Sequence, residues 1–226
     1  MTASAGERLS RARLYLIASR DFVRQGPPKP GFWQILAEAA AAGVDAVQLR
    51  FKGAETVALQ TGLLRAREAL PQQTLLLIND DMGAVHDATG RPLADGVHLG
   101  RSDAESVAGS APPGGDRITD GLLRARVWLG SDLLLGTSTR SADEIDRAVT
   151  AGADHVGFGA MAATSTKDDT QAASLDELTR CLEAFPETPI FPIGGLGPTT
   201  LAPVLDAGAT RTAVGAAILE ADDPGA

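Results

Sequence analysis

A phrase of eight residues occurs three times in the chain, and each copy follows a segment with helical spacing of apolar residues. The copies are Ala42–Leu49 (AGVDAVQL), Ala151–Phe158 (AGADHVGF) and Ala207–Val214 (AGATRTAV), and Asp95–Leu99 is a fourth, degenerate copy. A glycine in this place ends a helix in the left-handed conformation, and the apolar run after it is typical of a buried strand. The chain is therefore predicted to repeat a unit of helix, turn and strand.

Short apolar runs at eight places predict eight strands: Leu14–Ala18, Ala46–Leu49, Thr74–Ile78, Gly96–Leu99, Leu133–Gly136, His155–Phe158, Ile190–Ile193 and Thr212–Val214. Helical patterns lie between most of them: Phe32–Ala42, Thr56–Leu70, Ala142–Ala151 and Leu175–Phe185. Strict alternation of strands and helices over eight units favours one α/β domain with a (β/α)8 TIM barrel fold. A doubly wound open sheet is the competing arrangement, but it usually has fewer strands and lacks this even spacing.

The segments outside this pattern set the predicted domain limits. Residues 1–12 are small and polar, so we predict a flexible N-terminal segment followed by a barrel domain over residues 13–226. An extended connection at about residues 104–131 includes a predicted loop over Ala111–Asp120. No stretch approaches the roughly 20 apolar residues of a membrane span, and residues 1–13 lack the apolar run of a secretory signal. These features predict a cytoplasmic protein.

Composition limits the partners that the chain can bind. With 226 residues, 44% of them hydrophobic, the chain has enough apolar surface for one large core. The net charge of −9 argues against a general nucleic-acid binder and against binding to an anionic membrane. The single cysteine, Cys181, lies in an apolar-periodic segment and is expected to be a small buried side chain. The sequence leaves open whether the protein forms a homo-oligomer.

Polar residues follow most of the predicted strands, and in a parallel barrel these positions meet at one mouth. They comprise three cations, two neutral hydrogen-bonding residues and two carboxylates: Arg50, Lys52 and Lys167; Asn79 and Ser138; Asp80 and Asp103. Arginine and lysine bind phosphate oxygens, and carboxylates among such cations compete with an anionic substrate unless they hold a metal. Mg²⁺ is typically bound by one or two carboxylates together with phosphate oxygens. The set predicts Mg²⁺ and a pyrophosphate group, as substrate or leaving group.

Two glycine-containing turns, Gly194-Gly195 and Gly215-Ala216, follow the last two predicted strands. Glycine lets backbone N–H groups approach a phosphate closely, and barrels often bind phosphate at this place. Taken singly, each candidate also has a structural explanation, because Asn79, Asp80 and Asp103 favour helix caps and glycine pairs occur in any tight turn. Residues that can bind phosphate or a metal follow seven of the predicted strands. Their convergence at one mouth favours small phosphorylated molecules as ligands.

Taken together, these motifs resemble the thiamine phosphate synthase family. The matching stretches run in the family's order from about Tyr15 onward: Gln48-Leu49-Arg50-x-Lys52, Asn79-Asp80, Asp95-Gly96-Val97-His98-Leu99-Gly100-x-x-Asp103, Thr164-x-Thr166-Lys167, Ile193-Gly194-Gly195 and Ala221-Asp222-Asp223-Pro224. The resemblance implies a β/α barrel that joins 4-amino-5-hydroxymethyl-2-methylpyrimidine diphosphate to a thiazole phosphate and releases pyrophosphate. It implies a dissociative, Mg²⁺-dependent reaction in which pyrophosphate departs before the thiazole nitrogen attacks.

The resemblance also implies a role for each matching position. Arg50, Lys52 and Lys167 would be catalytic, and the pyrimidine diphosphate would be bound by Gln48, Arg50, Lys52, Asn79, Ser138 and Lys167. Thr164, Thr166, Gly195, Gly215 and Ala216 would hold the thiazole phosphate, and Asp80 and Asp103 would hold Mg²⁺. No general base is expected, because the attacking ring nitrogen has no proton to lose.

The chain departs from the family pattern at several places in the loops: Asp81, Arg101, Ala160–Ala163 and Ala216. Two alternatives therefore stay open. One is an isomerase like the thiazole tautomerase of the same fold, which has no need of the pyrophosphate cations or the metal carboxylates. The other is a non-catalytic barrel that binds a phosphate ligand. The retained charged set favours the synthase.

Overall fold

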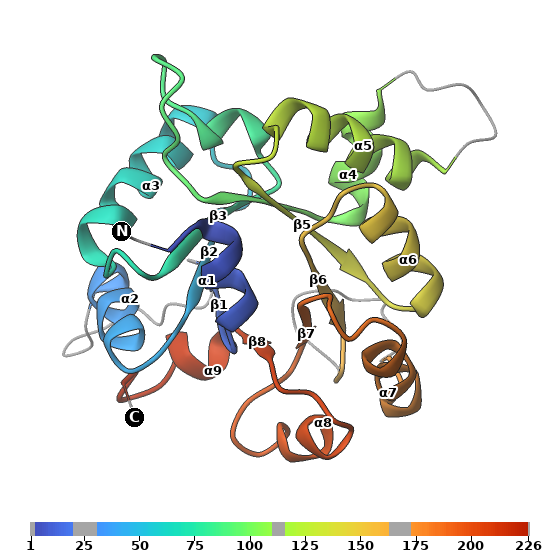
Figure 1. The fold of residues 1–226 in the computed structure, drawn as a ribbon. Coiled ribbons are helices and arrows are strands. Elements are labelled where there is room, and N and C mark those ends of the chain that lie inside the picture. Colours follow the sequence, from blue (N-terminus) through green and yellow to red (C-terminus); the bar gives the residue numbers. More distant parts are fainter. Residues whose placement is uncertain (1–2, 20–30, 110–115, 163–172, 226) are drawn as a thin grey trace.

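The computed structural model describes residues 3–19, 31–109, 116–162 and 173–225, and its centre is a closed barrel of eight parallel strands (Figure 1). The strands are β1 (Leu14–Ser19), β2 (Ala46–Arg50), β3 (Leu75–Asn79), β4 (Gly96–Leu99), β5 (Leu134–Thr139), β6 (His155–Gly159), β7 (Ile190–Ile193) and β8 (Thr212–Val214). Each strand pairs with its neighbours in chain order, and β8 closes the ring against β1. The predicted barrel fold and all eight predicted strands are confirmed.

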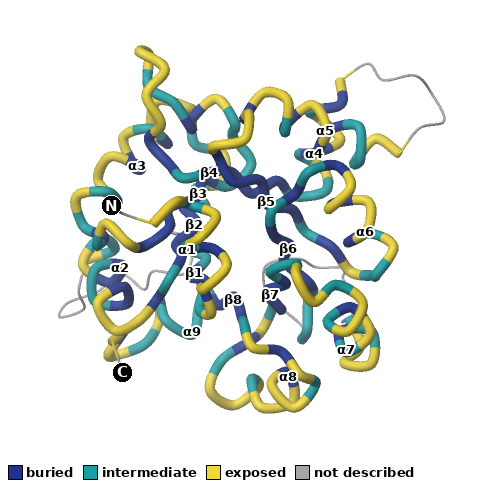
Figure 2. The backbone as a smooth tube through the Cα atoms, viewed as in Figure 1, coloured by how far each residue is buried: buried dark blue, intermediate teal, exposed yellow. Residues whose placement is uncertain are grey.

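Helices surround the barrel: α2 (Phe32–Ala41), α3 (Thr56–Ala69), α4 (Arg101–Ala108), α5 (Arg117–Leu129), α6 (Ala142–Thr150), α7 (Leu175–Ala184), α8 (Ala202–Asp206) and α9 (Ala216–Leu219). A short 3-10 turn, η2 (Met82–Val85), follows β3. The strands and the inward faces of the helices are buried, whereas the outward faces are exposed (Figure 2). A large apolar cluster fills the layer between strands and helices, and a second, smaller one fills the barrel interior.

The repeated phrase has a structural basis at the amino ends of the strands. Its glycines, Gly43, Gly152 and Gly208, have φ angles of 120°, 92° and 97°, the left-handed region expected at a helix end. In the first two copies an aspartate follows the glycine by two residues, and the degenerate copy begins with Asp95. Each of these aspartates accepts a hydrogen bond from the first or second backbone N–H of the preceding strand. These bonds join Leu14 N to Asp45 Oδ2 (3.0 Å), Leu76 N to Asp95 Oδ2 (2.7 Å) and Leu135 N to Asp154 Oδ2 (2.7 Å). The phrase thus ends a helix and links two neighbouring strands.

The N-terminal segment differs from its prediction. Residues Ala5–Arg11 form helix α1 instead of a flexible segment, with a capping box between Ser4 and Glu7. Leu9 and Ala12 are buried in the cluster inside the barrel, and Figure 1 shows α1 lying across the barrel centre. This helix therefore covers the amino-terminal end of the barrel. Sequence analysis missed it because the segment is too short for a clear apolar period.

The connection between β4 and β5 contains two helices, α4 and α5, that pack closely together. Of the loop predicted over Ala111–Asp120, residues 111–115 lie outside the described residues, and the prediction is wrong for 117–120, which belong to α5. Asp116 caps α5 by accepting hydrogen bonds from Ile118 N (3.1 Å) and Thr119 N (3.4 Å). A Cβ atom at Gly121 would lie 1.8 Å from the backbone oxygen of Ala104 on α4. The glycine is therefore needed for the close approach of α4 and α5.

Gly121→Ala is expected to lower the free energy of unfolding by about 2–3 kcal/mol, because the added methyl group forces the two helices apart. Gly6→Ala is the matched control, since it is also a helical glycine and nothing lies within 4 Å of an added Cβ there. That variant is expected to match the parent or gain up to about 1 kcal/mol from higher helix propensity. Urea unfolding followed by circular dichroism measures both, and equal stability of the two variants contradicts the prediction.

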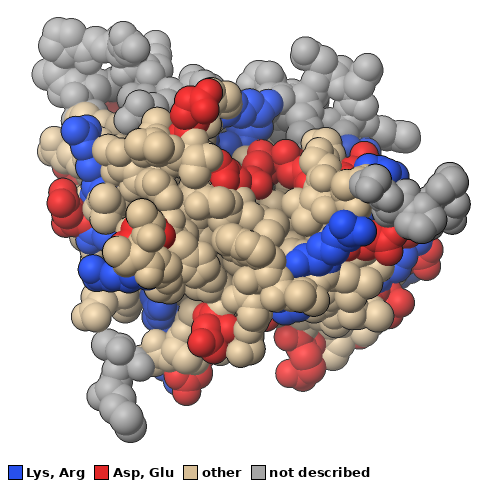
Figure 3. Space-filling view, turned by 90° about the horizontal axis from the view of Figure 1, so that it is seen from above, with Lys and Arg blue, Asp and Glu red and all other residues tan. Residues whose placement is uncertain are grey.

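Charged side chains of both signs are interspersed on the face seen in Figure 3, most densely at its edges.

Within the described residues, no helix is long and apolar enough to cross a membrane.

Candidate active site

A cavity of about 820 Å³ opens at the carboxyl ends of the strands. The predicted site residues that line it are Gln48, Arg50, Lys52, Asn79, Asp80, Asp103, Ser138, Gly195, Gly215 and Ala216. Lys167, Thr164 and Thr166, also predicted for the site, lie outside the described residues. Side chains distant in the sequence thus share one cavity, as the barrel topology requires.

Two carboxylates converge on the backbone of Gly100, at the end of β4. A Cβ atom at this glycine would lie 2.7 Å from Asp103 Oδ2 and 3.6 Å from Asp80 Oδ1. The backbone N–H of Gly100 donates to Asp80 Oδ1 at 3.2 Å, and the Asn79 amide donates to Asp80 Oδ2. A larger residue at position 100 would fill the space between the two acids.

Asp80 is held in an unfavourable state in two respects. Its φ of 66° is the single positive φ of a non-glycine residue among those the structure describes. Burial, and then the negative charge of Asp103, raise the pKa of Asp80 to about 6, although Gly100 and Arg50 act in the opposite direction. Strain of this kind is typical of functional positions, and the raised pKa shows that the negative charge is incompletely compensated.

Asp80→Asn is expected to raise the melting temperature above pH 6 by about 2–4 °C, which corresponds to about 1 kcal/mol after discounting for solvent screening. An acid whose pKa is raised on folding stabilises the fold below its ordinary pKa of 3.8 and loses that contribution as the pH rises through 6. The gain should therefore vanish towards pH 4. Asparagine also tolerates a positive φ, so the change adds little backbone strain.

Thermal unfolding in buffer with a chelator, scanned from pH 4 to pH 8, measures this difference. Asp132→Asn, which alters an exposed carboxylate, is the control and should show no such pH dependence. A variant no more stable than the parent at pH 8 contradicts the raised pKa of Asp80, which burial and then the charge of Asp103 cause.

Arg50 ends β2, is half-buried and supplies a positive charge to the cavity. Its Nη1 atom is buried and makes no hydrogen bond to any described residue. A buried guanidinium nitrogen left without a partner is costly, so the geometry is suited to an incoming anion. Lys52, exposed two residues later, adds a second cation to the same side of the mouth.

The floor of the cavity is polar and closely packed. Gln48 Nε2 donates to Tyr15 Oη at 2.8 Å, and His98 Nε2 lies 3.1 Å from Ser138 Oγ. Gly136 makes room for the histidines, because a Cβ there would lie 2.2 Å from His155 Nε2 and 2.7 Å from His98 Nδ1. Sequence analysis did not single out Tyr15, although a tyrosine inside an otherwise apolar strand was a usable signal.

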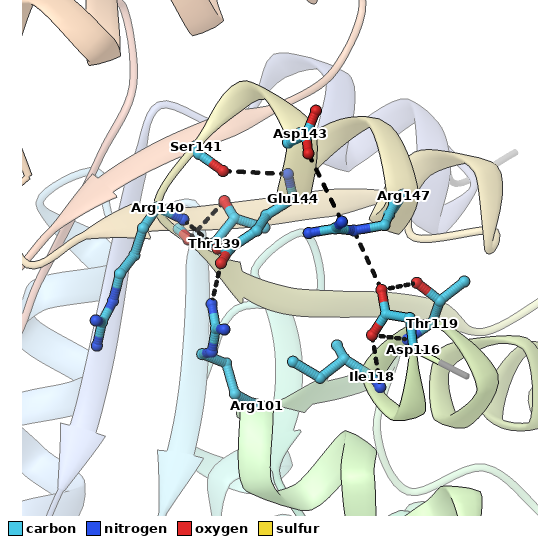
Figure 4. A network of polar contacts seen from close by, with 11 residues as sticks. Arg101, Asp116, Ile118, Thr119, Thr139, Arg140, Ser141, Asp143, Glu144 and Arg147 are labelled. Atoms are coloured by element: carbon cyan, nitrogen blue, oxygen red, sulfur yellow. Dashed lines mark hydrogen bonds and ion pairs between the residues drawn. The ribbon is translucent and has the colours of Figure 1, made fainter. Parts of the chain in front are cut away.

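Two departures from the family pattern, Arg101 and Asp81, have a structural explanation, and Figure 4 shows the contacts of Arg101. Arg101 forms an ion pair with Glu144, whose other oxygen accepts the backbone N–H of Arg140 at 2.7 Å. The Arg140 side chain points away from Glu144, and both arginines line the cavity. Asp81 instead caps η2 through Ala84 N (3.1 Å) and accepts a hydrogen bond from Thr56 Oγ1 at 2.7 Å. Arg101 and Arg140 are thus two cavity cations that sequence analysis did not include.

The glycine turns line the cavity with backbone. Gly194 and Gly195 have φ angles of 101° and 65°, and a Cβ at Gly194 would lie 2.6 Å from Ala160 Cβ. Gly215 precedes α9, and Ala216 begins it. These turns expose backbone N–H groups of a kind that bind phosphate oxygens.

Comparison with known proteins agrees with this geometry. Residues 14–218 match the family model described as thiamine monophosphate synthase. The chain is 35% identical to the thiamine-phosphate synthase of Thermobifida fusca, over 99% of this chain and 92% of that protein. It is 37% identical to that of Gloeobacter violaceus, over 99% of this chain and 58% of that protein. The chain thus spans only about half the length of several curated relatives that it matches.

A solved structure supports the fold. The thiamine phosphate pyrophosphorylase from Pyrococcus furiosus superimposes with a TM-score of 0.72 at 24% identity, over 96% of this chain and 92% of that one. At 24% identity this similarity supports the barrel fold and carries no conclusion about function.

Proposed function

Because the chain belongs to the thiamine monophosphate synthase family, we propose that it condenses 4-amino-5-hydroxymethyl-2-methylpyrimidine diphosphate with a thiazole phosphate. The bond from the exocyclic methylene carbon to the diphosphate oxygen breaks, and the thiazole nitrogen forms a new bond to that carbon. The products are thiamine phosphate and pyrophosphate. The observation that carries the proposal is the buried Nη1 atom of Arg50, which has no hydrogen-bond partner among the described residues and shares one cavity with the Asp80–Asp103 pair.

The cations stabilise the leaving group. Arg50 and Lys52, joined by Lys167 by family resemblance, bind the diphosphate and neutralise the charge that develops as the carbon–oxygen bond breaks. Gln48, Asn79 and Ser138 provide neutral hydrogen bonds that hold the pyrimidine and its diphosphate. The amino group of the pyrimidine donates electrons towards the methylene carbon, so the diphosphate can depart first.

The acidic pair fits a magnesium ion. Asp80 and Asp103 face the same small space at Gly100, and the raised pKa of Asp80 reflects negative charge that a cation would neutralise. Mg²⁺, when bound, supplies positive charge to the diphosphate oxygens. In the described residues no group of three or more His, Cys, Asp or Glu side chains forms a metal cluster. Substrate phosphate oxygens would therefore complete the coordination.

The second substrate is held at the glycine turns of the same cavity. We place its phosphate against the backbone of Gly195, Gly215 and Ala216, with Thr164 and Thr166 assigned by family resemblance. Binding both partners in one cavity brings the attacking nitrogen to the carbon without a general base. Because both substrates are small water-soluble phosphates, we place the reaction in the cytoplasm.

Release of pyrophosphate from the two precursors, with and without Mg²⁺, tests the proposal. The expected result is release that requires both precursors and the metal. Isomerisation of the thiazole phosphate without pyrophosphate release would support the tautomerase instead. Binding of the pyrimidine diphosphate without turnover would support a non-catalytic binder.

A further inference from the structure

Three arginines lie close together in Figure 4, and two of them are paired with acids. Arg101 forms an ion pair with Glu144, and Arg147 Nε lies 3.1 Å from Asp116 Oδ2. The third arginine, Arg140, makes no hydrogen bond or ion pair through its guanidinium with any residue that the structure describes. Arg140 lines the large cavity, so its guanidinium is available to an anion bound there.

Glu144 cannot neutralise the Arg140 guanidinium, because both of its carboxylate oxygens are already used. One oxygen binds Arg101, and the other accepts the backbone N–H of Arg140 at 2.7 Å. The backbone N–H of Glu144 donates to Ser141 Oγ at 3.3 Å, which fixes the acid in the first turn of α6. Figure 4 shows the Arg140 side chain extending away from this acid. The cavity therefore receives an uncompensated positive charge from this side.

The order of the strands places Arg140 across the acidic pair from Arg50. Arg50 ends β2, and Arg140 directly follows β5. Between them in the ring, Asp80 follows β3 and Asp103 lies on α4, which follows β4. Ser138, two residues before Arg140 on β5, lines the same cavity. An anion bound beside the acidic pair can therefore be contacted by guanidinium groups from two sides.

We propose that Arg140 is a further binding residue for the diphosphate group, which it contacts from the β5 side while Arg50 contacts it from the β2 side. This inference rests on the proposed function. A diphosphate offers oxygens on two phosphorus atoms, so two guanidinium groups can bind it at once. Position favours the diphosphate over the thiazole phosphate, because β5 neighbours β4, whereas the glycine turns follow β7 and β8.

Binding of inorganic pyrophosphate to Arg140→Ala, measured by calorimetry in Mg²⁺, tests the inference. The affinity is expected to fall about fivefold, the effect of losing one charged contact at an exposed position. The loss should become smaller at high salt, because exposed charges are screened. The affinity for the thiazole phosphate should stay at the parent value. Arg140→Lys keeps the charge without the two-donor geometry, so it should recover part of the pyrophosphate affinity.

Arg147→Ala is the matched control, since this neighbouring arginine does not line the large cavity and should leave both affinities unchanged. An unchanged pyrophosphate affinity in Arg140→Ala overturns the inference. An equal loss for both ligands, or a loss for the thiazole phosphate alone, overturns it as well. These outcomes leave the proposed function intact as long as the parent binds pyrophosphate. A parent protein that binds no pyrophosphate contradicts the proposed function, and with it the inference.

Discussion

Arg50→Ala is expected to lower kcat/KM for the condensation about a thousandfold, because losing one partner of a buried charge contact costs about 3–5 kcal/mol. The Nη1 atom of Arg50 is buried without a hydrogen-bond partner among the described residues, so we expect the diphosphate to bind there, in addition to the electrostatic interaction of Arg50 with Asp80. Steady-state pyrophosphate release measures the loss. The effect should appear in kcat as well as in KM, since charge on the leaving group is greatest in the transition state.

Two controls make this result specific. Arg50→Lys keeps the charge but loses the two-donor geometry, so it should recover only part of the rate. Arg65→Ala removes an exposed arginine on α3 and should leave the rate at the parent value. An Arg50→Ala enzyme within a few-fold of the parent would remove this residue from the mechanism.

Asp103→Asn is expected to raise the Mg²⁺ concentration for half-maximal activity about a hundredfold, because a carboxylate ligand becomes a neutral amide at a cost of about 3 kcal/mol. Asp80→Asn should shift the titration in the same direction, since both oxygens face the space at Gly100. Activity measured over a range of Mg²⁺ concentrations reports the shift. The same exposed control as in the stability experiment, Asp132→Asn, should give the parent titration curve.

The outcome also separates metal binding from packing. If saturating Mg²⁺ restores much of the activity of Asp103→Asn, the residue acts through the metal. A metal titration identical to that of the parent would falsify the ligand role of Asp103.

The fold could be predicted because the sequence pattern that specifies it is local and occurs several times in the chain. The same pattern, a glycine that ends a helix and then an apolar run, recurs in Ala42–Leu49, Ala151–Phe158 and Ala207–Val214. In each copy the glycine has the left-handed φ of a helix end. Helices α1, α4 and α5 were not predicted, because contacts with other segments hold them in place, α1 against the barrel interior and α4 against α5. Tertiary contacts of this kind leave little trace in a short sequence window.

The candidate site was predictable for the residues that directly follow strands. Barrel topology brings Arg50, Asp80 and Asp103 into one cavity, as the sequence indicated. The supporting contacts were not predictable, since nothing in the sequence links Tyr15 to Gln48 or Glu144 to Arg101. Side chains that hold a site in place are chosen by local packing, which a strand pattern does not specify. The roles of all the predicted site residues stay predictions, and Lys167, Thr164 and Thr166 lie outside the described residues.

The aspartates of the repeated phrase lie at the opposite end of the barrel from the cavity. Asp45, Asp95 and Asp154 fasten neighbouring strands there through hydrogen bonds of 2.7–3.0 Å. Three of the strand pairs, β1–β2, β3–β4 and β5–β6, are therefore fastened by residues that lie away from the cavity. Substitutions at the mouth, such as Arg101 or Ala216, can accumulate without opening the barrel, which lets one scaffold acquire a new substrate while it keeps its shape.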